Sequence, residues 1–259
     1  MPNKIDKCFA QLRTEKRKGF IPYICAGDPS LDRTVDLALA LEKAGADILE
    51  LGLPFSDPLA DGIVNQLAAQ RALAAGATTR GVLECVRKIR KQSEIPIVLY
   101  TYLNPIFQFG LAEFHRAAEA AGMDGLLILD LPPEEDVDLP GGNLIHIRLI
   151  APTTPPDRVA AIARRAKGFL YYISREGVTG ARDTISASLP EQVASLRKLT
   201  SLPIAVGFGI SSPKQAREVA SHADAIVVGS AIVDLIAKHG DKAVEKVGAF
   251  ARELVAAIK

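Results

Sequence analysis

Short apolar segments recur along the chain, and each is followed by a stretch with helical periodicity. Between them, segments such as 31–45 and 188–200 carry apolar residues at i, i+3 and i+4, as amphipathic helices do. Nearly continuous apolar strands that alternate with helices are typical of a parallel sheet covered by helices, so the pattern predicts an α/β fold. The eight expected strands are 20–25, 47–52, 95–101, 125–130, 144–150, 168–174, 203–209 and 225–230.

The number of strand–helix units favours a closed barrel over an open sheet. An open sheet would be expected to carry a dinucleotide-binding fingerprint, and the nearest candidate, 207–212, lacks the third glycine and follows a late strand. A similar sequence motif leads into three of the strands, which indicates a repeated βα unit: AGADILELG, AGMDGLLILD and SHADAIVVGS. We therefore predict a single-domain (β/α)8 TIM barrel over residues 1–259. Extra helices are expected at Ile5–Lys16, a candidate cap for the barrel bottom, and at Ser230–Lys238 and Lys242–Ile258.

Composition excludes several classes of partner. The net charge is +1, which gives no reason to expect nucleic acid or a membrane surface as partner. The three cysteines lack CxxC spacing, so neither a disulfide framework nor a metal site is predicted. Residues 1–19 lack the apolar region of a signal peptide, and no apolar stretch approaches the length of a membrane span. We expect a soluble, cytoplasmic protein.

The segment ELGLPFSDPLADG, residues 50–62, holds the first candidate functional side chains. Glu50 lies near the end of an apolar strand, and a buried carboxylate is costly unless it is paired or its pKa is shifted. Glu50 is therefore either a member of a structural ion pair or a reacting group. Asp61 is followed by glycine, so its alternative role is that of a turn residue. Both carboxylates would lie at the C-terminal ends of strands, where barrel active sites are found.

A second group of candidates follows the last two strands. Gly207, Gly209 and Gly229 allow the backbone to approach a ligand closely, and Ser230 opens a helix whose N-terminus favours an anion. Gly180, in the long segment after the sixth strand, could complete the site. Barrels often bind phosphate at this place, whereas the alternative is that the glycines only form tight turns. We predict a small phosphorylated substrate at the barrel mouth.

Six motifs together resemble the α subunit of tryptophan synthase, in order and spacing, over essentially the whole chain. They are PYICAGDP (22–29), ELGLPFSDPLADG (50–62), DLPPEE (130–135), SREGVTGA (174–181), VGFGIS (206–211) and GSAIV (229–233). The resemblance implies a carbon–carbon lyase of L-tryptophan biosynthesis. That family cleaves indole-3-glycerol phosphate to indole and glyceraldehyde 3-phosphate by a retro-aldol reaction, without a metal or an organic cofactor of its own.

The resemblance also implies roles for individual residues. We expect Glu50 to be a general acid, because an apolar strand end would raise its pKa. Asp61, on what we expect to be a more solvated loop, would stay ionised and accept the indole N–H. The other implied positions are Tyr171 beside the carboxylates; Gly180, Gly209, Gly229 and Ser230 at the phosphate; and Tyr23, Leu99, Tyr102 and Phe208 around the indole ring.

Family members dock on a β subunit that carries pyridoxal phosphate, in an α2β2 heterotetramer. The loops after the second and third strands would contact that partner, and the long segment 174–190 resembles a lid over the substrate. The residues implied for lid or partner contact are Pro54, Asp57, Asn104 and Thr179.

Two places depart from the family pattern. After Asp61 and Gly62 the family usually continues with a proline and a threonine or valine before Ile-Gln, whereas this chain has Ile63-Val64-Asn65-Gln66. Arg148 stands in the fifth strand, where a buried arginine needs a partner, with Asp130 or Glu134 as candidates. Asp130 is expected either to orient Glu50 or to end its strand. The departures leave two alternatives open: a catalytically weakened subunit that mainly activates the β subunit, or a free-standing lyase that releases indole. A different aldolase or isomerase is more remote.

Overall fold

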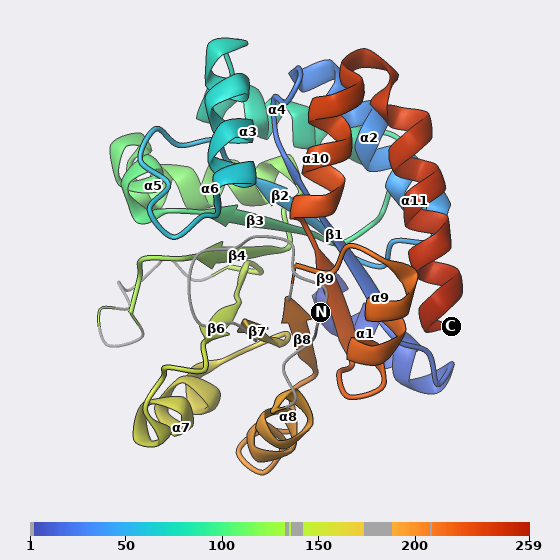
Figure 1. Ribbon diagram of the computed structural model, residues 1–259. Helices are drawn as coiled ribbons and strands as arrows, with labels where there is room; N and C mark the ends of the chain where they lie inside the picture. The colour runs from blue at the N-terminus through green and yellow to red at the C-terminus, as the bar shows by residue number, and fades with distance from the viewer. Residues whose placement is uncertain (1–2, 133–134, 136–141, 174–187, 208) are drawn as a thin grey trace.

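The computed structural model describes residues 3–132, 135, 142–173, 188–207 and 209–259. Within these residues the strands form one parallel sheet in the order β5-β4-β3-β2-β1-β9-β8-β7-β6 (Figure 1). The predicted α/β barrel is confirmed. The strands are β1 (Gly19–Cys25), β2 (Leu49–Gly52), β3 (Ile97–Thr101), β4 (Gly125–Ile128), β5 (Ile145–His146), β6 (Arg148–Ile150), β7 (Leu170–Ile173), β8 (Ile204–Gly207) and β9 (Ala225–Val228).

The barrel is closed by the segment predicted as a single strand, 144–150. This segment forms two short strands, β5 and β6, separated by Ile147, so the prediction of one continuous strand is wrong. Its first half pairs with β4 and its second half with β7, and the ladder is interrupted where the pairing changes sides. The Ile147 N–H still donates to the carbonyl of Leu126, at 2.9 Å. The expected eight strand positions are therefore present, one of them in two pieces.

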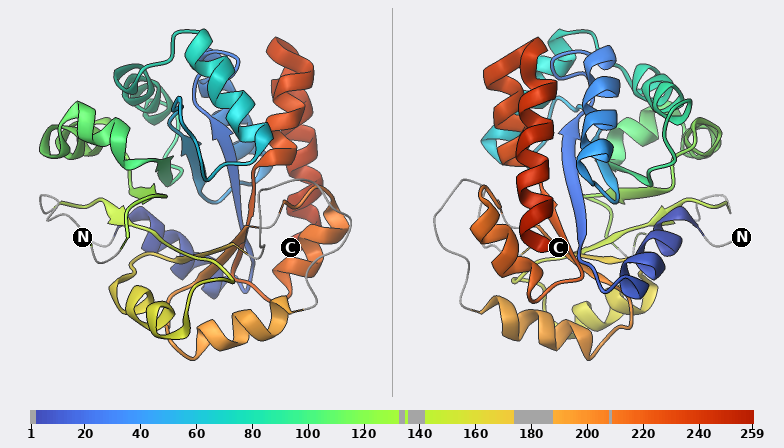
Figure 2. Two further views of the ribbon diagram at one scale, coloured as in Figure 1. Left: turned by 60° about the vertical axis from the view of Figure 1, so that its left-hand side comes forward. Right: turned by 90° about the vertical axis from the view of Figure 1, so that its right-hand side faces the viewer.

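Helices cover the outside of the barrel, as Figures 1 and 2 show. Leu49, Leu51 and Leu99 point outward into the apolar layer beneath them. The predicted helix 31–45 is confirmed as α2, which begins after the Ser30 cap and ends at Gly45 in a left-handed conformation (φ 104°). No helix within the described ranges is long and apolar enough to cross a bilayer. The helices between the strands are α2 (Leu31–Ala44), α3 (Ile63–Ala74), α4 (Thr79–Arg90), α5 (Leu103–Phe109), α6 (Leu111–Ala121), α7 (Pro156–Arg165), α8 (Leu189–Arg197) and α9 (Pro213–Ala220).

The extra helices predicted at the two ends of the chain are present. At the N-terminus, α1 (Lys4–Thr14) closes the bottom of the barrel, because Ile5, Phe9 and Leu12 pack against the apolar side chains inside it. The Phe9 and Phe169 rings lie 5.5 Å apart. At the C-terminus, α10 (Ser230–His239) and α11 (Ala243–Ile258) are joined by the short 3-10 helix η2 (Gly240–Lys242), and α11 packs against α2 and α9.

The three similar sequence phrases produce one repeated contact at the barrel bottom. Each contains an aspartate whose carboxylate accepts a hydrogen bond from a backbone N–H of the preceding strand. The pairs are Asp47 with Phe20 (2.8 Å), Asp124 with Ile97 (2.9 Å) and Asp224 with Ile204 (2.8 Å).

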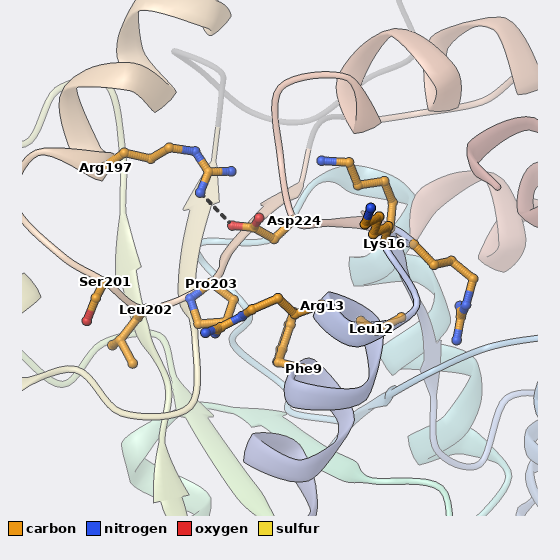
Figure 3. Close-up of a pocket in the computed structure, with 11 residues that line it drawn as sticks. Phe9, Leu12, Arg13, Lys16, Arg197, Ser201, Leu202, Pro203 and Asp224 are labelled. Carbon is orange, nitrogen blue, oxygen red and sulfur yellow. Dashed lines mark ion pairs between the residues drawn. The ribbon is translucent and has the colours of Figure 1, made fainter.

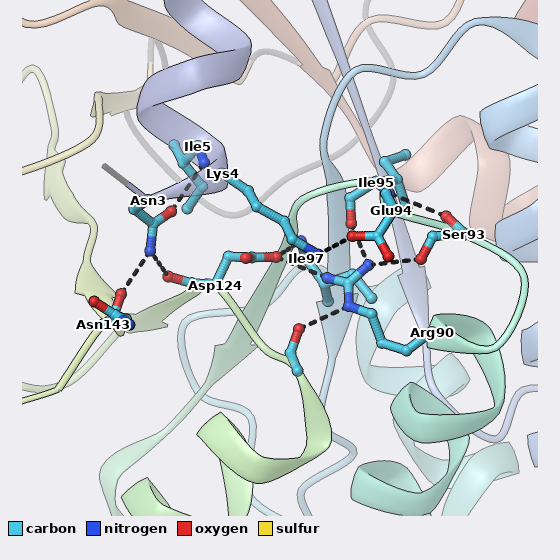
Figure 4. Close-up of polar contacts among 11 residues, drawn as sticks. Asn3, Lys4, Ile5, Arg90, Ser93, Glu94, Ile95, Ile97, Asp124 and Asn143 are labelled. Atoms are coloured by element: carbon cyan, nitrogen blue, oxygen red, sulfur yellow. Dashed lines mark hydrogen bonds and ion pairs between the residues drawn. The ribbon is translucent and has the colours of Figure 1, made fainter. Parts of the chain in front are cut away.

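An arginine pairs with each of these aspartates: Arg17 with Asp47, Arg90 with Asp124, and Arg197 with Asp224. Figure 4 shows the Arg90–Asp124 pair and Figure 3 the Arg197–Asp224 pair. The repeat therefore joins neighbouring strands and stabilises the end of the barrel opposite the predicted site.

Candidate active site

A cavity opens at the C-terminal ends of the strands, and about 170 Å³ of it is accessible to water. It brings together seven of the residues expected to be functional: Tyr23, Glu50, Asp61, Tyr171, Gly209, Gly229 and Ser230. These residues come from five separate regions of the sequence. The other described residues that line the cavity are Ala60, Gly62, Asn65, Tyr100, Leu129, Leu149, Ile173, Gly207 and Val227.

Glu50 reaches the cavity because of the alternation of side chains along β2. Leu49 and Leu51 face the helices, so Glu50 between them faces the barrel interior. Glu50 is buried, with only 3% of the residue exposed. Burial raises the pKa of the Glu50 carboxyl to about 8, and the nearby charge of Asp61 adds to the shift. Glu50 therefore holds a proton near neutral pH.

Asp61 lies in the connection between β2 and α3, and two tyrosine hydroxyls donate to its carboxylate. The Tyr102 hydroxyl donates to Oδ2 at 2.7 Å and the Tyr100 hydroxyl to Oδ1 at 2.8 Å. Burial raises the pKa of Asp61, whereas the hydrogen bonds from these tyrosines and Asn65 lower it. Asp61 is 5% exposed, so the expectation of a solvated loop is wrong. The hydroxyl groups replace water as donors to the carboxylate.

Two of the residues expected around the indole ring lie elsewhere. Leu99 points away from the cavity into the layer beneath the helices, and its neighbour Tyr100 faces the cavity instead. Tyr102 is buried against Asp61, its ring lies tilted against that of Phe55 with the centroids 5.4 Å apart, and it is absent from the cavity wall. Tyr100 was missed because the alternation along β3 has two possible phases. Its polar tip is a signal that could have identified the inward phase.

Two glycines make room for the tyrosines of the site. A Cβ atom at Gly207 would lie 2.7 Å from the Tyr171 hydroxyl, and one at Gly52 would collide with the Tyr23 ring. Tyr171 is buried, and both burial and the charges of Glu50 and Asp61 raise its pKa well above the usual value. Its hydroxyl is therefore protonated and available as a hydrogen-bond donor.

The expected phosphate end of the cavity is built from β8, β9 and α10. Gly209 has a positive φ of 56°, which favours glycine at this turn. Ser230 is the first residue of α10, with Gly229 before it, and the N–H groups of Ser230 and Ala231 have no partner within the helix. Such a terminus favours an anion. Thr179, Gly180 and Phe208, and residues 174–187 of the expected lid, lie outside the described residues, whereas Leu189 and Pro190 begin α8.

The connections that follow β2 and β3 carry exposed apolar side chains. Leu59 is 89% exposed and Phe107 63% exposed. Of the residues expected at a partner contact, Asp57 and Asn104 are exposed, whereas Pro54 is buried.

Asp130 and Arg148 lie outside the cavity that holds Glu50 and Asp61. Asp130 accepts a hydrogen bond at 2.7 Å from the Leu103 N–H, at the start of α5. Arg148 is buried on the outer side of the barrel and lines a separate cavity that Asp130 also lines.

Another cavity lies at the bottom of the barrel, between α1 and the loops before β8 and β9 (Figure 3). It is lined by basic side chains and by Asp224, which is paired with Arg197. Glu50 and Asp61 are not part of it. Within the part of the chain that the structure describes, no group of three acidic, histidine or cysteine side chains is arranged to hold a metal ion.

Comparison with known proteins places these features in one family. The family model described as tryptophan synthase alpha chain matches residues 9–259. A tryptophan synthase alpha chain from Opitutus terrae is 48% identical over 264 residues, covering 99% of each chain. One from Citrifermentans bemidjiense is 46% identical over 257 residues, covering 97% of this chain and 96% of the relative. A crystal structure of the alpha chain from Legionella pneumophila superimposes with a TM-score of 0.90 at 38% identity, covering 100% of this chain and 98% of that one. A chain of tryptophan synthase from Mycobacterium tuberculosis gives a TM-score of 0.90 at 33% identity, covering 100% and 99%.

Proposed function

The chain belongs to the tryptophan synthase alpha chain family, a lyase family that acts on indole-3-glycerol phosphate, and we propose that Glu50 and Asp61 carry out that cleavage here. The observation that carries the assignment is the pair of buried carboxyl groups in one cavity, with the pKa of Glu50 raised to about 8. Two carboxyl groups in different environments take different roles, one as acid and one as anion.

Glu50 is the proton donor. Cleavage of the bond between indole C3 and the glycerol carbon requires a proton on C3, and the protonated Glu50 carboxyl supplies it. The electron pair of the broken bond then returns to the ring and restores its aromaticity. As the glycerol carbon becomes an aldehyde, its hydroxyl proton passes to the Glu50 carboxylate or to a water held there, and Glu50 regains its acidic form.

Asp61 stabilises the charge that develops on the ring. Protonation of C3 makes the ring cationic, and an ionised carboxylate that accepts the ring N–H lowers the energy of that state. The hydroxyls of Tyr100 and Tyr102 stabilise the anionic form of Asp61 inside a buried site. Tyr171 is a third polar group on the cavity wall, and its hydroxyl would donate a hydrogen bond to a substrate oxygen.

The phosphate of the substrate is assigned to the side of the cavity that β8, β9 and α10 form. Gly209, Gly229 and Ser230 bring backbone N–H groups and the start of α10 to one place, which is a common phosphate site in barrels. The proposed chemistry needs only protein side chains and no cofactor bound to this chain.

We further propose that the connections after β2 and β3 contact a β subunit of tryptophan synthase, in an α2β2 assembly whose pyridoxal phosphate belongs to the partner. Leu59 and Phe107 support this assignment, because each is a large apolar side chain left exposed in a connection at the C-terminal end of the barrel, and exposed apolar surface marks protein contacts. Asp57 and Asn104 lie in the same connecting segments and are exposed.

The test is indole release from indole-3-glycerol phosphate by the purified chain, alone and with a β subunit. The wild type should release indole and should respond to the β subunit, whereas Glu50→Gln should lower kcat by at least about 10³-fold without loss of fold, as measured by circular dichroism. Full activity of Glu50→Gln would exclude Glu50 as the acid. Stimulation of the β subunit by a wild-type chain that releases no indole would support the regulatory alternative instead.

A further inference from the structure

Asp61 is held by donors from two neighbouring elements. Tyr100, within β3, and Tyr102, just after it, each donate to one carboxylate oxygen, and the Asn65 Nδ2 on α3 lies 3.5 Å from Oδ1. The resemblance to the family implied an apolar side chain, Leu99, for this part of the pocket. Because Tyr100 occupies the inward position, the cavity wall here carries a hydroxyl group.

Tyr100 is itself held in a fixed place. It belongs to a central strand and lies opposite Gly52 in the parallel pairing of β2 with β3. Its ring packs edge-on against Tyr23, with the centroids 5.1 Å apart and an interplanar angle of 70°. Asp61, in contrast, belongs to the irregular connection 53–62. A side chain on a strand therefore fixes a carboxylate on a loop, and strands position groups more accurately than loops do.

The carboxylate keeps acceptor capacity for a substrate. A carboxylate has about four lone pairs, and the two tyrosine hydroxyls use two of them. The Tyr102 hydroxyl also accepts the Ala60 N–H at 3.0 Å, so its own proton is available for Asp61.

The described part of the cavity wall supplies no positive charge that could stabilise the Asp61 anion in place of the hydroxyl groups. None of the described residues that line the cavity is a lysine or an arginine. The titratable groups whose charges interact with Asp61 are Glu50 on β2, Tyr23 and Cys25 on β1, Tyr100 and Tyr102 at β3, and Tyr171 on β7. All of them are neutral or negative at neutral pH. Hydroxyl donors are therefore what favours the anion.

We propose that Tyr100 is a positioning residue: its hydroxyl fixes the Asp61 carboxylate, in its ionised form, in the orientation that accepts the ring N–H of the substrate. The proposal rests on the role of Asp61 assigned under the proposed function. Tyr100 acts through Asp61 and takes no part in the bond-breaking step itself.

The variant that tests it is Tyr100→Phe, which keeps the ring and removes only the hydroxyl. We expect kcat/KM for indole release to fall about 10- to 100-fold, as for the loss of one hydrogen bond to a charged group. Removing the donor raises the pKa of Asp61, so the acid limb of the kcat/KM profile should move to higher pH. Carboxyl ¹³C NMR should show the same upward shift in the titration of Asp61, independently of activity.

The matched control is Tyr172→Phe, which also removes a tyrosine hydroxyl. Tyr172 lies next to Tyr171 in β7, but its side chain faces outward, away from the cavity. This control variant should leave both kcat/KM and the acid limb unchanged. An unshifted titration of Asp61 in a folded Tyr100→Phe variant would overturn the proposal.

A double-mutant cycle separates this proposal from the proposed function. Once Asp61→Asn has removed the anion, adding Tyr100→Phe should have no further effect on the residual rate. An equal loss in both backgrounds would show that Tyr100 acts independently of Asp61, and would overturn the positioning role alone. If Asp61→Asn itself leaves indole release unchanged, the proposed function of Asp61 fails instead.

Discussion

The carboxyl groups of Glu50 and Asp61 face the same cavity, and the charge of Asp61 helps to raise the pKa of Glu50. Asp61 therefore has two functions in the proposed reaction: it accepts a hydrogen bond from the substrate, and it helps to keep Glu50 protonated. The tyrosine hydroxyls that bind Asp61 contribute to both effects, because they favour its anionic form.

The first prediction concerns the pH dependence of the reaction. Cleavage needs Glu50 protonated and Asp61 ionised, so kcat/KM for indole release should follow a bell-shaped curve. Its basic limb should fall near pH 8, where Glu50 loses its proton in the free enzyme. Steady-state rates between pH 5 and 10 measure it, and a plateau that extends unchanged beyond pH 9 would contradict the assignment of Glu50.

The second prediction concerns stability. The pKa of Glu50 is about 8 in the folded chain and 4.5 for a glutamate exposed to water, so the unfolded chain releases this proton first as the pH rises. The wild type should therefore lose stability relative to Glu50→Gln between about pH 4.5 and 8, by up to about 5 kcal/mol for a shift of this size, and no further above pH 8. Urea unfolding of both proteins at pH 5 and pH 8.5 measures the difference. Parallel stability curves would show that the Glu50 carboxyl is not perturbed.

The third prediction uses the close approach of Gly207 and Tyr171. A methyl group at position 207 would lie 2.7 Å from the Tyr171 hydroxyl, so Gly207→Ala should displace Tyr171 and lower kcat/KM for indole release by at least about 10-fold. The control is Gly248→Ala on α11, where the nearest atom would be 3.6 Å away. That change should leave activity intact and stabilise the helix by about 0.5–1 kcal/mol in thermal unfolding. Equal activity of the two variants would show that the site tolerates the movement of Tyr171.

The fourth prediction concerns Asn65, one of the departures from the family pattern. Its Oδ1 atom is buried and has no hydrogen-bond partner among the described residues. A buried acceptor without a partner costs about 1–3 kcal/mol, whereas the contact from Asn65 Nδ2 to Asp61 is long, at 3.5 Å, and contributes less. Asn65→Leu removes both, so it should raise the free energy of unfolding of the unliganded chain. The neighbouring control is Gln66→Leu, which loses the hydrogen bond from its Nε2 to the Asp61 carbonyl (2.8 Å) and should be destabilised by about 1 kcal/mol. Denaturant unfolding of both variants measures the contrast, and a destabilised Asn65→Leu would indicate that the acceptor is satisfied in solution.

The sequence by itself determined the fold class and the order of the elements, because alternation of apolar strands and amphipathic helices is a local pattern. It also located the repeated aspartates, Asp47, Asp124 and Asp224, and the motifs that identify the family. Glu50 was found for the same reason: a carboxylate inside an apolar strand conflicts with its immediate neighbours, and that conflict is visible without any tertiary information.

Only the tertiary structure decided which face of each strand meets the cavity and what surrounds each side chain. Alternation along β3 allows either Leu99 or Tyr100 to face inward, and pairing with the neighbouring strands selects Tyr100. Asp61 was expected on a more solvated loop, but it is buried, with the hydroxyls of Tyr100 in β3 and of Tyr102 just after it bound to its carboxylate. The break at Ile147 likewise arises from pairing with two different strands. These features depend on contacts between residues far apart in the chain, and no local pattern contains them.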